Sequence, residues 1–144
     1  MAAGVQVVTD CADPARLAEF WAAALGYKIQ DPPTGFDSWE SFLEAQGVPE
    51  SQWNSASAVV DPEGKGPRFF FQRVPEPKTV KNRVHVDLAV SGGLAEPLEQ
   101  RKVKCEAEAR RLETLGAKQL WTNEERLGYS LVMADPEGNE FCLH

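Results

Sequence analysis

A pattern of motifs occurs twice in the 144 residues of this chain, once in each half. A Leu-Gly pair ends a helix-like stretch at 25–26 and again at 115–116. The tetrapeptide Asp-Pro-Glu-Gly stands at 61–64 and at 135–138, each time before an apolar, strand-like run. Internal repeats of this kind mark structural units with the same construction. Each half predicts the order strand, helix, strand, strand, strand, so we expect two βαβββ modules and an α+β fold.

The first module is predicted over residues 1–78. Asp13 followed by Pro14 is typical of a helix N-terminus, because the carboxylate caps free N–H groups and proline fits the first helical position. Gly26 is typical of a helix end, and the apolar side chains between these limits have the spacing of a helix face that packs on a sheet. The expected strands of this module are residues 5–9, 27–30, 55–60 and 68–73.

The second module is predicted over residues 79–144. Apolar and polar side chains alternate through 84–90, which is typical of a half-buried strand and places His85 and Asp87 on the same face. A helix is expected at 97–115. Its apolar side chains on successive turns are Val103, Ala107 and Leu115. The remaining expected strands are residues 118–121, 129–134 and 139–143.

The two modules differ in length between the Leu-Gly pair and the Asp-Pro-Glu-Gly turn, where the first module is considerably longer. We assign the extra residues to an insertion at 31–54, in which residues 38–44 have the pattern of a short amphipathic helix. An insertion this apolar either covers a ligand cavity or a partner subunit, or it packs over the end of the sheet. Its large apolar side chains are Trp39, Phe42, Leu43 and Trp53.

Composition excludes several classes of function. The chain has 15 Lys and Arg residues against 22 Asp and Glu residues, a formal net charge of −7, so it lacks the basic surface that nucleic acid binding needs. No apolar stretch is long enough to span a membrane, and no signal peptide is recognisable, so we expect a cytoplasmic protein. Its three cysteines, Cys11, Cys105 and Cys142, are widely spaced and indicate neither a disulfide framework nor a zinc knuckle.

The motifs, taken in their order along the chain, resemble those of the vicinal oxygen chelate superfamily and, within it, the bacterial glyoxalase-like domain. The segments that carry the resemblance are residues 10–14, 20–21, 25–26, 71–78, 81–87 and 135–142. Members of this superfamily include glyoxalase I, extradiol dioxygenases, methylmalonyl-CoA epimerase, fosfomycin-modifying enzymes and bleomycin-resistance proteins. The resemblance implies a single domain over 1–144, in which eight strands of a mixed sheet curl into a cup with the helices outside.

The resemblance also implies where a ligand binds and how the chain assembles. The concave face of the cup holds a small molecule, and helices on one face of a sheet leave the other face available for such a site. An exposed sheet edge and the habit of the family both favour a homodimer.

Metal-using relatives hold one divalent ion with four residues, which correspond here to Gln6, Gln72, His85 and Cys142. Two neutral amides are poor donors, and a thiolate favours zinc over the iron or manganese that a set of histidines and a carboxylate binds. We therefore expect no bound metal or other cofactor, with zinc the most plausible ion if one binds. Dioxygenase and glyoxalase I chemistry are disfavoured for the same reason.

The resemblance makes His85 the candidate catalytic residue, because imidazole titrates near neutral pH and can act as acid or base. The alternative is that a neighbouring amide such as Gln72 satisfies its hydrogen bonds. Cys142 is either a thiol activated by a nearby cation such as His85 or, more simply, a small packed residue. Glu140 lies on the same strand face as Cys142 and either supplies a carboxylate or is solvated.

We expect a glyoxalase-like protein that binds an apolar or aromatic metabolite, with sequestration as in bleomycin-resistance proteins as one role. The alternative is a lyase or isomerase, metal-independent or weakly metal-dependent, that uses His85 as acid or base. A third reading, an interaction module without a ligand, holds if the aromatic side chains of the insertion fill the cup. The predicted ligand-binding residues are Gln6, Trp53, Phe70, Gln72, His85, Asp87, Trp121, Glu140 and Cys142.

Overall fold

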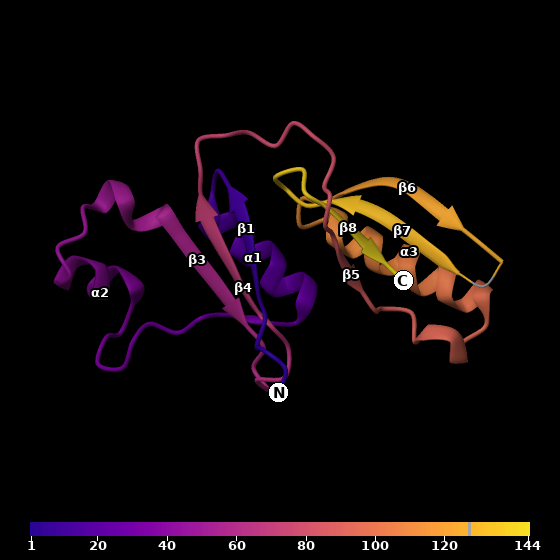
Figure 1. Ribbon diagram of the computed structural model, residues 1–144, viewed down its shortest axis with the longest axis horizontal. Helices are drawn as coiled ribbons and strands as arrows, with labels where there is room; N and C mark the ends of the chain where they lie inside the picture. The colour runs from indigo at the N-terminus through magenta and orange to yellow at the C-terminus, as the bar shows by residue number, and fades with distance from the viewer. Residues whose placement is uncertain (127) are drawn as a thin grey trace. The chain divides into compact units, whose positions relative to one another are not determined.

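A computed structural model of the protein describes residues 1–126 and 128–144. The chain forms two compact units, residues 1–77 and 78–144, and each contains a four-stranded sheet (Figure 1). The α+β class and the two βαβββ modules are thereby confirmed, while the joining of the sheets into one cup stays a prediction. Within the described residues, no helix is both long and apolar enough to cross a membrane.

The first unit has the strand order β1-β4-β3-β2, in which β1 runs parallel to β4 and the other neighbours are antiparallel. Helix α1 packs on one face of this sheet, against β3 and β4. Strands β3 and β4 are antiparallel neighbours, joined by the turn that contains residues 61–64. The elements are β1 (Gln6–Cys11), α1 (Pro14–Leu25), β2 (Lys28–Ile29), β3 (Ala56–Val60) and β4 (Arg68–Arg73).

Local signals in the sequence set both ends of α1. The Asp13 side chain accepts a hydrogen bond from the Arg16 backbone N–H over 3.3 Å, and Pro14 takes the first helical position. Gly26 ends the helix in the left-handed conformation, with φ of 69°. The predicted limits of this helix are therefore confirmed, because capping depends only on residues that are adjacent in the chain.

The core of the first unit lies between α1 and the sheet. The rings of Trp21 and Phe69 stack with centroids 5.7 Å apart, and Phe71 is fully buried. Because side chains alternate along a strand, Phe70 and its neighbours two residues away, Arg68 and Gln72, lie on the opposite face of β4. That face carries the polar and aromatic side chains of the candidate site.

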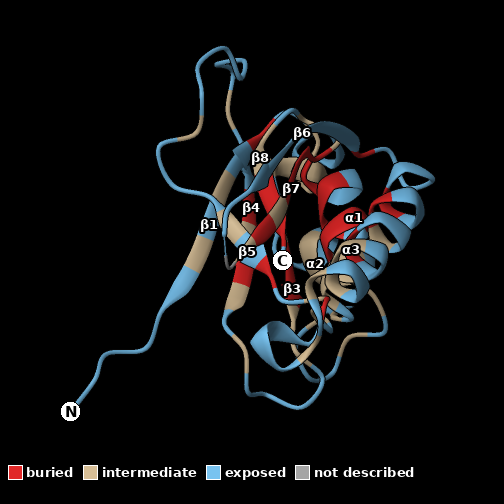
Figure 2. Cartoon of the chain, turned by 90° about the vertical axis from the view of Figure 1, so that its right-hand side faces the viewer, coloured by how far each residue is buried: buried red, intermediate tan, exposed pale blue. Residues whose placement is uncertain are grey.

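The second unit repeats the topology with the strand order β5-β8-β7-β6. Strand β5 runs parallel to β8, and the other neighbours are antiparallel. Helix α3 packs on β6, β7 and β8, and Figure 2 shows buried residues on these strands and on α3. The elements are β5 (Val86–Leu88), the short 3-10 helix η2 (Gly93–Ala95), α3 (Leu98–Glu113), β6 (Lys118–Glu124), β7 (Tyr129–Ala134) and β8 (Glu140–Leu143).

Two expectations for the second unit need correction. Strand β5 has only three residues instead of the seven at 84–90, although the backbone N–H of Val90 still donates to the carbonyl of His144 over 2.8 Å. Helix α3 buries Cys105, Ala109 and Leu112, whereas Val103 is 62% exposed. Cys105 and Ala109 are small, so this face of the helix can lie close to the sheet with Leu112 in the core, and packing decided which face is covered.

The insertion of the first unit forms α2 (Trp39–Ala45) and the 3-10 helix η1 (Glu50–Ser55). Ser38 and Ser41 form a capping box at the start of α2. The indole N–H of Trp39 donates to the carbonyl of Gln30 over 2.7 Å, and that of Trp53 donates to the carbonyl of Val48 over 2.9 Å. Neither helix has a fully buried residue. Hydrogen bonds therefore hold the insertion where apolar burial is incomplete.

The repeated tetrapeptide forms the same turn in both units. Asp61 and Asp135 each accept a hydrogen bond from the backbone N–H two residues later, over 2.9 Å in both cases. The last residue of each turn, Gly64 or Gly138, has a positive φ of 69° or 88°. The repeated motif therefore forms a hydrogen-bonded turn with a positive-φ glycine in each unit.

Candidate functional site

A cavity of about 450 Å³ lies in the first unit, between the sheet and the insertion. Its size falls within the range of small-molecule sites. Most of the wall is apolar and comes from β2, β3, β4, α2 and η1. The side chains that give this character include Ile29, Trp39, Leu43, Trp53, Ala58 and Phe70.

Arg68 is the cationic residue of this cavity. Its Nε donates to Oε1 of Gln30 over 2.6 Å, and its Nη1 donates to Oε1 of Gln6 over 2.7 Å. The guanidinium carbon also lies 5.2 Å from the centroid of the Phe70 ring. Among the described residues, no carboxylate lies within 4.0 Å of this guanidinium. The Arg68 guanidinium is thus held in one orientation by hydrogen bonds, and no carboxylate of the described residues neutralises its charge.

Asn54, another lining residue, connects the insertion to the start of α1. Its Nδ2 donates to Oδ1 of Asp13 over 2.8 Å, and its Oδ1 accepts from the backbone N–H of Ala15 over 2.9 Å. The hydrogen bond from Asn54 is the main reason that the pKa of Asp13 lies below its usual range. One amide side chain therefore joins the cavity wall to the helix cap.

The predicted residues of the first unit are only partly brought together. Trp53 and Phe70 line the cavity, and Gln6 reaches it through Arg68. Gln72 is exposed and donates from Nε2 to Oδ1 of Asp10 over 2.7 Å. Gln6 does not suit a divalent cation, because its oxygen already accepts a hydrogen bond from a guanidinium whose positive charge would repel the ion.

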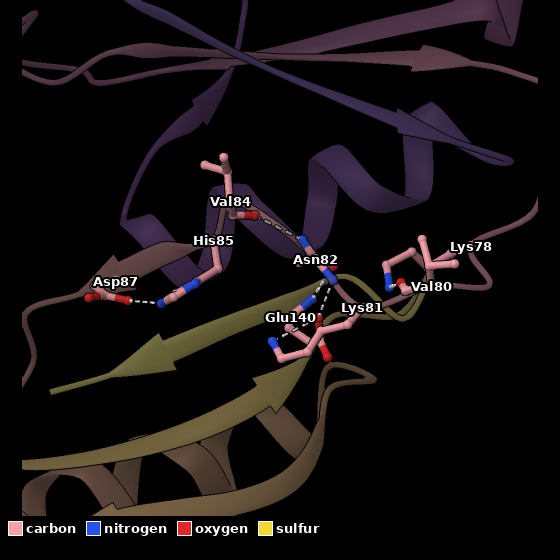
Figure 3. Close-up of polar contacts among 8 residues, drawn as sticks. All are labelled: Lys78, Val80, Lys81, Asn82, Val84, His85, Asp87 and Glu140. Carbon is pink, nitrogen blue, oxygen red and sulfur yellow. Dashed lines mark hydrogen bonds and ion pairs between the residues drawn. The ribbon is translucent and has the colours of Figure 1, made fainter.

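A second group of predicted residues gathers in the second unit. His85 and Asp87 point toward each other in Figure 3, with Nε2 and Oδ1 separated by 3.1 Å. A donor atom of each, together with Sγ of Cys142, lies within 4.8 Å of the other two. The imidazole is thus paired with a carboxylate of its own strand face.

Cys142 is buried beneath this pair. Burial, followed by the charge of Asp87 and a hydrogen bond to it, raises the pKa of the Cys142 thiol to about 11. The thiol is therefore protonated at neutral pH, and it fits the expectation of a packed residue instead of an activated nucleophile.

Glu140 clamps the segment that leads into β5 (Figure 3). Its Oε2 accepts from the backbone N–H of Asn82 over 2.6 Å, and its own backbone N–H donates to Oδ1 of Asn82 over 3.2 Å. The Nζ of Lys81 lies 3.6 Å from the same carboxylate and 5.6 Å from the ring centroid of Trp121. The Glu140 side chain is only 12% exposed, so the expectation of a solvated glutamate is wrong.

The trio of His85, Asp87 and Cys142 fits a divalent ion better than the four positions implied by the resemblance. It offers nitrogen, oxygen and sulfur donors, a combination that zinc accepts in three-ligand sites. An ion there would have to displace the thiol proton, which makes binding pH-dependent. A metal site is therefore chemically available within the second unit.

The prediction from sequence missed several residues of the cavity. Trp39 and Leu43 line the cavity but are absent from the predicted ligand-binding residues, although the insertion that carries them was one that could cover a ligand cavity. Gln30, which holds Arg68, was expected only as a strand residue. Strand alternation already placed Arg68 on the face of Phe70, and this was the available signal. Nothing in the sequence indicates that Gln30 would face Arg68, because Gln30 directly follows β2 whereas Arg68 begins β4.

Comparisons with known proteins agree with this geometry. The family profile described as "Glyoxalase-like domain" matches residues 6–144. None of the curated proteins compared with the chain is similar enough to count as a relative. Among solved structures, a possible glyoxalase from Bacillus cereus is 15% identical, with a TM-score of 0.60 and coverage of 99% of this chain and 98% of that one.

Two further structures with the same fold are complexes with ligands. A variant of the fosfomycin resistance protein FosX from Listeria monocytogenes, complexed with Mn(II) and 1S,2S-dihydroxypropylphosphonic acid, has a TM-score of 0.64 and 11% identity, covering 100% of this chain and 90% of that one. The bleomycin-binding protein from Streptomyces verticillus, complexed with copper(II)-bleomycin, has a TM-score of 0.53 and 16% identity. The match covers 99% of this chain and 95% of that one. The profile match spans nearly the whole chain, and the protein is therefore a member of the glyoxalase-like domain family in the vicinal oxygen chelate superfamily.

Proposed function

We propose that this protein binds an apolar or aromatic small molecule in the cavity of the first unit, as a binding or sequestering protein. The observation that carries the proposal is the cavity itself, which stays open although the insertion brings two tryptophans to its wall. A binding role is compatible with the family, since a bleomycin-binding protein has the same fold. An interaction module whose insertion fills its own site is not favoured by this geometry.

The wall suits a flat ring. Trp39, Trp53 and Phe70 present large aromatic surfaces from three different elements. Aromatic pairs add about 0.5–1.5 kcal/mol beyond the burial of apolar area, so a ligand ring gains more here than an aliphatic chain of equal area. The serines and Asn54 at the wall supply hydrogen bonds for a few polar groups.

Calorimetric titration with 2-naphthamide and with 2-naphthoate tests the proposal. These compounds share one aromatic ring system and differ in charge. We expect at least one to bind at one site per chain, with a dissociation constant on the order of 10–100 µM. If neither compound produces a binding isotherm, the cavity is not an aromatic site and the proposed function is wrong.

The His85–Asp87 pair favours a second candidate, a lyase or isomerase of the same superfamily. The Nε2 of His85 faces Asp87, so the neutral imidazole donates there and keeps Nδ1 available to accept a proton from a substrate. Asp87 would orient the ring. A zinc ion held by the trio with Cys142 would polarise a substrate oxygen when bound.

Cobalt(II) titration tests whether this trio binds a metal. Coordination by a thiolate and an imidazole produces visible absorption that Cys142→Ala and His85→Ala abolish. Lys104→Ala in α3 serves as a control because Lys104 is not one of the three donor residues. No absorption in the wild-type protein would leave the second candidate only its metal-free form.

We include a homodimer and a cytoplasmic location in the proposal. Strand β6 forms an edge of its sheet and is exposed along its whole length, with Trp121 44% exposed, which suits pairing with a second copy. The three cysteines are free, as expected in a reducing compartment. Native mass spectrometry gives the mass of the assembly directly, and a monomer at micromolar concentration would contradict the dimer.

A further inference from the structure

We propose that the cavity of the first unit selects aromatic molecules that carry a negative charge, such as an aromatic carboxylate, and that Arg68 recognises this charge. The inference rests on the proposed function, because it names the class of ligand for the same cavity. It starts from a contrast between the net charge of the chain, −7, and a cation that forms no ion pair with any carboxylate of the residues that the structure describes.

The partners of Arg68 are two neutral amides. Gln6 and Gln30 each accept one hydrogen bond from the guanidinium, over 2.7 and 2.6 Å, and they leave its Nη2 and one hydrogen on Nη1 unused. A carboxylate at either position would have neutralised the charge. Amides hold the group in place without doing so, which is the arrangement that an anion receptor needs.

Three cations elsewhere in the chain are paired with carboxylates. Arg111 is bound by Glu108 at 2.5 Å, Lys28 by Asp31 at 2.5 Å, and Lys102 by Glu124 at 2.7 Å. Arg68 is half-buried at the cavity, where the low polarity of the wall strengthens an interaction with an anion. Its planar group can bind both oxygens of a carboxylate, and Phe70 beneath it restricts its motion.

Two glutamates, Glu19 and Glu40, also line the cavity. Both are exposed, so water screens their charges, and neither forms an ion pair with Arg68. Glu40 lies in the first turn of α2, where the helix N-terminus stabilises a negative charge. A ligand anion is thus favoured beside the half-buried Arg68, whose charge is screened less than those of the exposed glutamates, and this would orient the ligand in the cavity.

The test compares 2-naphthoate with 2-naphthamide by calorimetry in the wild-type protein and in two variants. We expect the wild type to bind the carboxylate at least about tenfold more tightly, the gain typical of a charge-assisted hydrogen bond. Arg68→Gln should remove this preference while the affinity for 2-naphthamide changes less than about threefold. Arg68→Lys should keep part of the preference, because the charge remains and the forked geometry is lost.

Three outcomes contradict the proposal in different ways. Equal affinity of the wild type for both compounds, or a preference that survives Arg68→Gln, overturns the role of Arg68 and leaves the proposed function intact. Binding of neither compound removes the proposed function and this inference with it. The wild-type comparison and Arg68→Lys keep the test decisive even if Arg68→Gln fails to fold.

Discussion

Asn54 donates a hydrogen bond from Nδ2 to Oδ1 of Asp13 over 2.8 Å and so ties the end of the insertion to the cap of α1. The same amide accepts from the backbone N–H of Ala15. Two groups that α1 could not satisfy within itself are therefore satisfied by a residue about 40 positions later, at the cavity wall. The stability of the first helix and the shape of the cavity are coupled through this side chain.

Replacing Asn54 by Ala should lower the free energy of unfolding by about 1–2 kcal/mol, because it removes both hydrogen bonds. The pKa of Asp13 lies below its usual range in the folded protein, so its carboxylate contributes stability above about pH 4 and loses it as the pH falls further. The difference between wild type and Asn54→Ala should therefore shrink below about pH 4. Urea titrations at pH 3 and pH 7 measure this difference in the free energy of unfolding. Asn123→Ala in β6 is the control, and its difference from the wild type should not depend on pH in this way.

Filling the cavity should abolish ligand binding and leave the fold intact. Ala56 lines the cavity and is itself exposed, so Ala56→Leu adds volume where a ligand would lie and does not displace core residues. We expect at least a tenfold loss of affinity for the naphthalene probes and a change in the free energy of unfolding below about 1 kcal/mol. Ala107→Leu, on the exposed side of α3, is the matched control, and an equal loss of binding in it would argue against this site.

Deprotonation of Cys142 should destabilise the protein in alkali. Its pKa is raised to about 11 in the folded chain and is near 8.5 in an unfolded one, so the protonated thiol contributes stability below about pH 8.5 and loses it between there and pH 11. The loss should be on the order of 2 kcal/mol. Urea unfolding at pH 8 and pH 10.5 measures the change, and Cys142→Ala should show a smaller one. A pH dependence unchanged in that variant would contradict the assignment.

Removing the Glu140 carboxylate should loosen the segment that precedes β5. Glu140→Ala leaves the backbone N–H of Asn82 without its acceptor, which we expect to cost about 1–3 kcal/mol. Glu99→Ala is the comparison, since its ion pair with Lys102 is exposed and should contribute under about 1 kcal/mol. Hydrogen exchange should show faster exchange of the amide of Asn82 in the first variant only. Unchanged exchange there would mean that the clamp does not hold this segment.

The elements that short-range signals define were predictable from the sequence. The limits of α1 follow from Asp13, Pro14 and Gly26, and the repeated turns follow from the chemistry of aspartate, proline and glycine. The registry of β4 placed Arg68 and Phe70 together because side chains alternate along any strand. These features depend on neighbours a few positions away, and the two-module pattern of the fold was visible for the same reason.

Other predictions failed because they depend on contacts between distant segments. The buried side of α3 contains Cys105 and Ala109, which hydrophobicity alone would not favour over Val103. The clamp between Glu140 and Asn82 joins residues 58 positions apart. The residues next to them in the sequence do not indicate such distant partners.

By itself, the sequence determined the order of the secondary structure, the caps and the turns, because the conformational preferences behind them act over a few residues. Only the tertiary structure decided which side chains meet. Gln6 and Arg68 are separated by 62 positions and become hydrogen-bonded because β1 and β4 are neighbours in one sheet. Which polar groups satisfy one another, and hence what the cavity can bind, follows from the packing of whole elements and not from the chemistry of any one residue.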